Sequence, residues 1–151
     1  MRERRFCGPV EPRNRHLHID ILLKIYYNIY IKYRKRLSFM YSIYVDDVRP
    51  CPEGYDKYCK TTNDTVKAIR KKYKEGVRHF LVDLDNDTED AVNDTNGGEF
   101  TNILRQLESY VHLGKMAGLN LEVAIHTGNP SARENMRSII RGNSTWMKEV
   151  Y

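Results

Sequence analysis

The sequence predicts an α/β protein with an open, parallel sheet that follows an N-terminal extension. From residue 41 onward, short apolar segments of strand length alternate with amphipathic segments at helical spacing, the order that gives parallel α/β sheets. Residues 77–84 are nearly continuously apolar, as expected of a strand covered on both faces. The length of 151 residues fits one domain, and no run of 18 or more apolar residues predicts a transmembrane span.

The extension, residues 1–40, differs in composition from the domain predicted for residues 41–151. Residues 1–20 are arginine-rich and poor in apolar residues, which predicts disorder. Residues 21–33 read ILLKIYYNIYIKY, with apolar and polar positions on separate helical faces, and KYRKR follows at 32–36. This stretch is compatible with a membrane-surface helix over residues 21–36, a helix packed on the domain, or upstream sequence translated from a start site assigned too early.

The first half of the domain contains one strong and one weak strand signal. Residues 42–45 predict a short strand, and a turn region with Pro50, Pro52 and Gly54 follows. Residues 55–60 are a weak strand candidate, too close to the first strand for a full crossover helix between them. Thr62 or Asn63 is then expected to cap a helix that ends at Gly76.

The second half repeats the strand–helix unit. The predicted strand at 77–84 precedes an acidic, Asn-rich loop over 85–97, and apolar spacing over 100–111 indicates a helix. Residues 119–125 form the next strand, and Asn129-Pro130 is a favourable N-cap and first position for a helix that ends at Gly142. Residues 145–150 are a candidate last strand.

Charge and cysteine content narrow the function classes. Residues 1–40 hold 10 Lys/Arg and 3 Asp/Glu, a balance of +7, whereas residues 41–151 hold 15 and 17, a balance of −2. The basic character therefore belongs to the extension, and we expect no specific DNA binding. Three cysteines without CxxC spacing indicate neither a disulfide framework nor a zinc site. With no signal peptide visible, we expect a cytoplasmic protein.

Acidic side chains follow two of the predicted strands. Asp46 and Asp47 end the first strand, and residues 83, 85 and 87 are aspartates at the end of the third. Because parallel strands end at one rim of a sheet, these carboxylates should converge, and they would repel one another without a cation. Oxygen ligands suit Mg²⁺ or Mn²⁺, so we predict a metal site formed by Asp46, Asp47, Asp85 and Asp87. The alternative is that Asp46 or Asp47 simply caps a turn.

His126 is the most informative single residue, because it ends the fourth strand three positions before a capped helix begins. The N–H groups at that helix start favour an anion such as phosphate, and an imidazole suits acid–base chemistry near neutral pH. A structural histidine is the alternative. Arg49 could hold a phosphate or form a salt bridge with Asp47 or Glu53. The sequence fits the EF-hand and haloacid-dehalogenase signatures poorly. It lacks the two-histidine phosphoesterase, nucleophile-elbow and Walker signatures.

Three motifs resemble those of one known family. YVDDVRP at 44–50, FLVDLDND at 80–87 and HTGNPSARENM at 126–136 are similar to the LDDxRP-like, LDHD-like and HSxNPxGxxNM-like motifs of the cyclic-phosphate processing receiver domain family. The resemblance covers residues 42–150. It implies a receiver-like, flavodoxin-type fold with a shortened first crossover, and a role in binding or processing nucleotides or RNA ends that carry cyclic phosphates. Asn86 stands where the family usually has His, Thr127 replaces Ser, and Ala132 replaces a common Gly.

The family resemblance suggests a metal-assisted phosphoesterase. His126 and Asp85 would be catalytic, the metal would be Mg²⁺ or Mn²⁺, and Arg49, Asn129 and Asn135 would bind phosphate. One alternative is a non-enzymatic signalling module in which Asp85 accepts a phosphoryl group. Standard receivers also carry a lysine at the fifth strand, which is not evident here. Another alternative is a sensor that binds a cyclic nucleotide without turnover.

Overall fold

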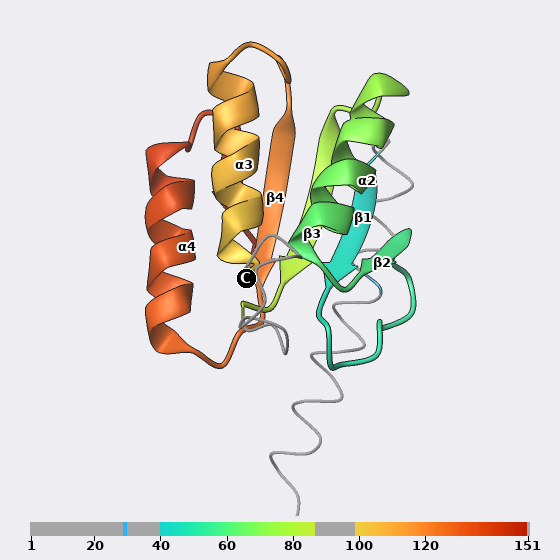
Figure 1. The fold of residues 1–151 in the computed structure, drawn as a ribbon, viewed down its shortest axis with the longest axis vertical. Coiled ribbons are helices and arrows are strands. Elements are labelled where there is room, and N and C mark those ends of the chain that lie inside the picture. The colour runs from blue at the N-terminus through green and yellow to red at the C-terminus, as the bar shows by residue number, and fades with distance from the viewer. Residues whose placement is uncertain (1–28, 30–39, 87–98, 151) are drawn as a thin grey trace, which may run out of the picture.

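A five-stranded, all-parallel sheet forms the centre of the protein (Figure 1). The structure is a computed structural model that describes residue 29, residues 40–86 and residues 99–150. The strands follow the order β2-β1-β3-β4-β5, which confirms the predicted open parallel sheet. Their bounds are β1 (Met40–Val45), β2 (Lys57–Cys59), β3 (His79–Leu84), β4 (Asn120–Ile125) and β5 (Met147–Glu149).

The connection between β1 and β2 contains no helix, as the spacing of the two strand signals predicts. Residues 46–56 pass from β1 to β2, and the two strands pair in parallel with Ile43 opposite Lys57. Asp56 holds this connection, because its Oδ2 accepts hydrogen bonds from the Ser42 backbone N–H at 2.8 Å and the Ser42 hydroxyl at 2.9 Å. The Asp56 carboxylate thus fixes the end of this helix-free connection against β1.

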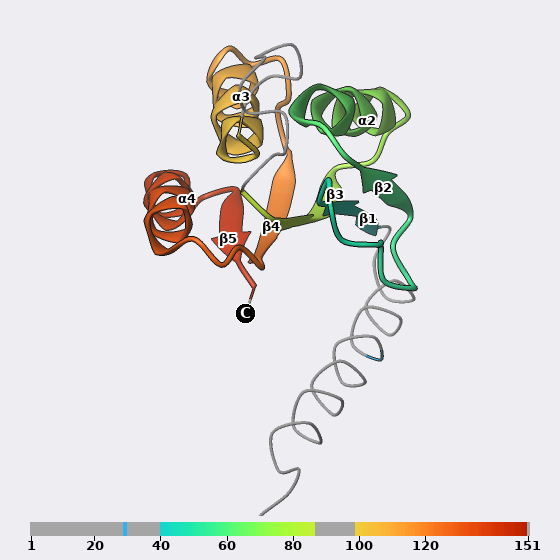
Figure 2. The same cartoon turned by 60° about the horizontal axis from the view of Figure 1, so that its bottom comes forward.

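The helices α2 (Thr62–Lys74), α3 (Thr101–His112) and α4 (Pro130–Gly142) lie on one face of the sheet (Figure 2). Thr61, rather than the predicted Thr62 or Asn63, is the N-cap of α2, since its hydroxyl accepts the Asp64 N–H at 3.1 Å. Asn129 is the N-cap of α4, as predicted. The predicted ends of the three helices therefore lie within one or two residues of the observed ends.

Alternation along the strands divides the sheet into two faces. On β3, Phe80, Val82 and Leu84 point into the main core with the helices, and all three are fully buried. The intervening residues Leu81 and Asp83 lie on the opposite face, where Leu81 joins a second small cluster. Polar and apolar side chains are mixed on that opposite face, and several of the polar ones belong to the site described below.

Several predictions for the extension lie outside the described residues. These include disorder over residues 1–20 and membrane-surface contact through residues 21–36, where only Ile29 is described. β1 begins at Met40, and the division between residues 1–40 and residues 41–151 stays a prediction. None of the helices in the described part of the chain is long and apolar enough to cross a membrane.

Candidate functional site

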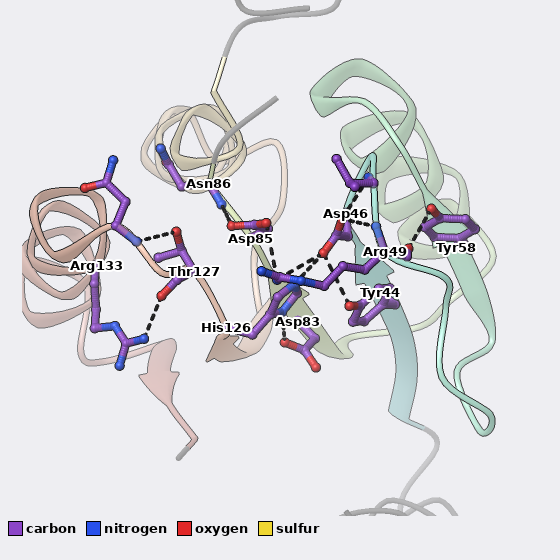
Figure 3. Close-up of polar contacts among 12 residues, drawn as sticks. Tyr44, Asp46, Arg49, Tyr58, Asp83, Asp85, Asn86, His126, Thr127 and Arg133 are labelled. Atoms are coloured by element: carbon purple, nitrogen blue, oxygen red, sulfur yellow. Dashed lines mark hydrogen bonds and ion pairs between the residues drawn. The ribbon is translucent and has the colours of Figure 1, made fainter. Parts of the chain in front are cut away.

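Asp46, Asp85 and His126 meet at the carboxyl ends of β1, β3 and β4. Each is the first residue after its strand, and the parallel ladder continues through their backbones: Asp85 N–H donates to the Val45 carbonyl at 3.1 Å, and His126 N–H to the Leu84 carbonyl at 2.9 Å. One ligand atom from each of these three side chains lies within 4.8 Å of the others, a geometry that could hold a metal ion. Figure 3 shows the three converging on one point.

Asp46 is fully buried and organises the turn that leaves β1. Its Oδ1 accepts the backbone N–H groups of Val48 at 2.9 Å and Arg49 at 2.6 Å. Burial raises the pKa of Asp46, but these two N–H groups and His126 outweigh it, so the pKa is lowered overall. Asp46 therefore caps a turn, as the alternative interpretation held, and its other oxygen still faces the cluster.

Arg49 lies across the cluster and joins two of its carboxylates (Figure 3). One guanidinium nitrogen is 3.4 Å from Oδ2 of Asp46 and 3.4 Å from Oδ2 of Asp85. The expected alternatives were Asp47 and Glu53, so the sequence indicated a salt bridge but not its partners. The Arg49 side chain remains 53% exposed, which leaves this cation accessible to an anion from solvent.

His126 is held between two carboxylates. Its Nδ1 lies 2.6 Å from Oδ1 of Asp83 and its Nε2 lies 3.1 Å from Oδ2 of Asp46, while its ring stacks on Tyr44 with a centroid distance of 4.9 Å and an interplanar angle of 4°. Burial, the largest influence, lowers the pKa of His126, but Asp83 foremost, then Asp46 and Asp85, raise it more. The net pKa is raised, because a carboxylate oxygen faces each ring nitrogen and favours a proton there.

Asp83, Tyr44 and Tyr55 complete the site, and the sequence analysis did not assign them roles in it. Asp83 orients His126 through Nδ1, and the Tyr55 hydroxyl donates to the other Asp83 oxygen. Period-two alternation could have found two of them, because Tyr44 precedes Asp46 by two residues and Asp83 precedes Asp85 by two. Tyr44 and Asp83 are also direct register partners on β1 and β3.

The other predicted site residues lie in different surroundings. Asp47 is half-buried next to Asp46 but is not one of the three residues whose ligand atoms converge. Asp87 is outside the described residues. The Asn129 side-chain oxygen accepts the N–H groups of Ser131 and Ala132, so the helix-start donors expected to hold phosphate already have a cap. Asn135 is exposed on α4.

Two positions near the rim connect the strands to the helices. The Asn86 side-chain oxygen accepts the Thr101 hydroxyl at 2.5 Å, and the Asn86 carbonyl accepts the Phe100 N–H, which fixes the start of α3. The Thr127 hydroxyl accepts the Asn129 N–H at 3.2 Å. Both side chains thus support the backbone around the cluster, and the buried Asn86 does so where an imidazole is usual in the resembled motif.

We expect the stability of the metal-free protein to be highest in mildly acidic solution. The raised pKa of His126 gives stability that is fully present below its unfolded value of about 6.5 and is lost as pH rises through its folded pKa. The lowered pKa of Asp46 gives stability that is present above its unfolded value of 3.8 and is lost as pH falls through its folded pKa. Urea unfolding with a chelator present, from about pH 5 to about pH 9, measures the alkaline loss.

His126→Gln is the control for this pH dependence. Glutamine does not titrate, so the free energy of unfolding of this variant should change less between neutral and alkaline pH than that of the parent. Equal slopes for the two proteins would contradict a raised His126 pKa.

The fold and the site together define a receiver-like α/β protein: a parallel sheet of order β2-β1-β3-β4-β5 with acidic residues at the carboxyl ends of β1 and β3. Comparison with known families matches residues 41–142, more than half of the chain, to the cyclic-phosphate processing receiver domain. The chain belongs to the cyclic-phosphate processing receiver domain family. No curated protein and no solved structure matches it significantly.

Proposed function

We propose that the protein binds a cyclic phosphate of a nucleotide or an RNA end and opens it by metal-assisted hydrolysis. The observation that supports this most is the imidazole of His126, held between Asp83 at 2.6 Å and Asp46 at 3.1 Å next to the half-exposed cation Arg49. A cyclic phosphodiester carries one negative charge, and its hydrolysis needs a proton for the departing alkoxide. The site offers both a cation for the phosphate and an acid for the leaving group.

The donor set fits a divalent cation. Two carboxylates, Asp46 and Asp85, supply the oxygen ligands that Mg²⁺ and Mn²⁺ favour. Asp47 and Asp87 stay predicted as further ligands. When bound, such an ion would polarise the phosphoryl oxygen and lower the pKa of a water molecule. In this mechanism the carboxylates would hold the ion and His126 would not, because a metal on Nε2 would replace the proton that His126 must donate.

The residues of the chain then have distinct roles. Arg49 binds the non-bridging phosphate oxygens, because its guanidinium is exposed and presents a planar set of donors. Asp85 accepts a proton from the attacking water as the new P–O bond forms. His126 donates its Nε2 proton to the ribose oxygen as the old P–O bond breaks, and Asp83 keeps the ring oriented through Nδ1. Proton return from Asp85 to His126 restores the site.

The alternative in which Asp85 accepts a phosphoryl group covalently is less well supported by the positions of the charged side chains. Lys148 is the lysine of β5, and its ammonium lies 3.1 Å from Oε1 of the buried Glu122 rather than in the cluster. Asp85 itself already accepts the Asn86 N–H at 2.7 Å and the Arg49 guanidinium. A phosphoryl acceptor would need these contacts to open.

The test is a panel of 2′,3′- and 3′,5′-cyclic nucleotides, measured for binding and for hydrolysis with and without Mg²⁺ or Mn²⁺. We expect metal-dependent hydrolysis of at least one class. We also expect the metal alone to raise the thermal midpoint, because a ligand that binds only the native state stabilises it. Asp85→Asn should abolish both the turnover and the metal-induced shift.

The other outcomes separate the alternatives. Binding of a cyclic nucleotide without hydrolysis would contradict the enzyme and favour the sensor. Labelling by acetyl phosphate that is lost in Asp85→Asn would favour the receiver. A metal-induced shift that persists in both Asp46→Asn and Asp85→Asn would show that this cluster is not the metal site.

A further inference from the structure

A lysine-lined groove runs between β2 and α2, at the edge of the sheet. It has a volume of about 610 Å³, and we name it the lysine groove after the lysines that line it with two tyrosines: Lys57, Lys60, Lys67, Lys71, Lys72, Tyr41 and Tyr58. A second hollow of about 430 Å³ continues it along α2, because Lys67 and Lys71 line both and Arg70 and Lys74 extend the second. The two hollows form one track along the helix, mostly basic, with Glu75 as the acidic residue that lines the second hollow.

The positive charge of this groove is local rather than a property of the whole domain. Residues 41–151 hold 15 Lys/Arg and 17 Asp/Glu, yet Asp64 is the single acidic residue among those lining the lysine groove. Lys72 forms an ion pair with Glu75 at 2.6 Å. Lys57, Lys60, Lys67 and Lys71 make no ion pair within residues 40–86 and 99–150. Such a concentration of unneutralised ammonium groups attracts a polyanion.

Two tyrosines are interleaved with these lysines. The ammonium of Lys72 lies 5.2 Å from the ring centre of Tyr41, and that of Lys60 lies 5.6 Å from the ring centre of Tyr58. Basic grooves with aromatic rings are the usual surface for single-stranded nucleic acid, where the ammonium groups follow the phosphates and the rings stack on bases. The lysine groove therefore suits RNA better than an acidic protein segment, which would not use the rings.

The lysine groove is joined to the candidate site by one side chain. Tyr58 lines the groove, and its hydroxyl donates to the backbone carbonyl of Arg49 at 3.0 Å. Figure 3 shows this contact between β2 and the turn that holds Arg49. A strand that leaves the groove past Tyr58 would therefore reach the turn that carries Arg49.

We propose that the lysine groove binds the single-stranded RNA that precedes a terminal cyclic phosphate, so that the substrate is an RNA end rather than a free nucleotide. This inference rests on the proposed function for its terminal group, but the binding of the preceding strand does not. A mononucleotide needs only the Arg49 end of this surface. Basic residues spread along β2 and α2 can contact the successive phosphates of a longer polyanion, which a mononucleotide does not have.

The test compares a short 5′-labelled, single-stranded RNA with a 2′,3′-cyclic end, the same RNA with a 3′-hydroxyl end, and a 2′,3′-cyclic mononucleotide. The variant is Lys67→Glu with Lys71→Glu, both exposed on α2. Its affinity for both RNAs should fall by about tenfold or more, and the salt slope of binding should become shallower by about 0.7 for each lost phosphate contact. Its binding of the mononucleotide should stay as in the parent.

A matched control separates net charge from position. Arg105→Glu with Lys115→Glu makes the same change in net charge at exposed residues outside the lysine groove, and it should leave RNA affinity within about twofold. Tyr58→Phe keeps the ring and should retain more RNA affinity than Tyr58→Ala. RNA affinity unchanged in the Lys67 and Lys71 variant would overturn the proposal, as would equal competition by polyglutamate, which would indicate an acidic protein partner.

The 3′-hydroxyl RNA distinguishes the two proposals. If no cyclic phosphate is hydrolysed but this RNA still binds through Lys67 and Lys71, the proposed function fails and the groove assignment holds. If the mononucleotide is hydrolysed and neither RNA binds more tightly than it, the groove assignment fails and the proposed function holds.

Discussion

Replacing His126 by glutamine should lower the turnover of a cyclic phosphate by about 10²–10⁴-fold and leave unfolding cooperative. Glutamine can still form hydrogen bonds at this position, but it cannot donate a full proton to a departing alkoxide. The half-exposed Arg49 cation is unchanged, so substrate binding should remain within a few-fold of the parent. Initial rates and binding affinities with the same cyclic nucleotide measure both effects.

Asp83→Asn separates proton transfer from positioning. The amide oxygen can still accept the Nδ1 proton of His126, but the negative charge that raises the pKa of His126 is lost. The alkaline limb of the pH–rate profile should therefore move to lower pH, an effect that a merely structural Asp83 would not produce. Full turnover in His126→Gln would remove the proton-transfer role. His126→Ala should also lose stability, because Asp46 and Asp83 lose a partner, so the turnover of His126→Gln is the test of the catalytic role.

Asp46→Ala should destabilise the protein by about 3–5 kcal/mol, the usual cost of removing one partner from a buried ion pair. Asp46 is fully buried, and its carboxylate accepts from two backbone N–H groups and faces His126 at 3.1 Å. Alanine leaves both N–H groups and the imidazolium without this acceptor. Urea unfolding at about pH 6, where His126 is charged, gives the free energy of unfolding.

Two matched variants show where that loss comes from. Asp46→Asn keeps an oxygen for the N–H groups of Val48 and Arg49 but removes the charge, so its loss should lie between zero and that of Asp46→Ala. Glu53→Ala removes an exposed carboxylate from the same connection and should change stability by no more than about 0.5 kcal/mol. Similar losses in Asp46→Ala and Glu53→Ala would contradict the central role of Asp46.

Most of the fold could be predicted because each element had its own local signal. The Asn129-Pro130 pair gave the start of α4, and apolar spacing gave α3 and β4. β2 was weak in sequence because only three residues pair with β1, and long-range contacts hold it, among them the bond between Asp56 and Ser42 and the burial of Cys59 in the core. The N-cap of α2 was misplaced by a residue or two because Thr61, Thr62 and Asn63 are all good capping residues.

The site was predictable to the extent that strand ends determine it. Asp46, Asp85 and His126 converge because parallel strands end at one rim. The direction of each side chain depends on distant partners, which the sequence does not give. Arg49 turns to Asp46 and Asp85, and Asp83 turns to His126, because these basic side chains provide partners for buried or partly buried carboxylates. The spacing of these residues in the sequence does not predict which carboxylate each basic side chain contacts.

The three-residue β2 strand also affects how molecules of this protein meet one another. Among the strands that the structure describes it lies at one edge of the sheet, and the backbone groups of an edge strand are ones on which another chain could add as a further strand. Here Lys57 lies within β2 and Lys60 directly follows it, both exposed. Aligning two such edges would bring like charges together, so the lysines proposed to hold RNA also oppose aggregation through sheet extension.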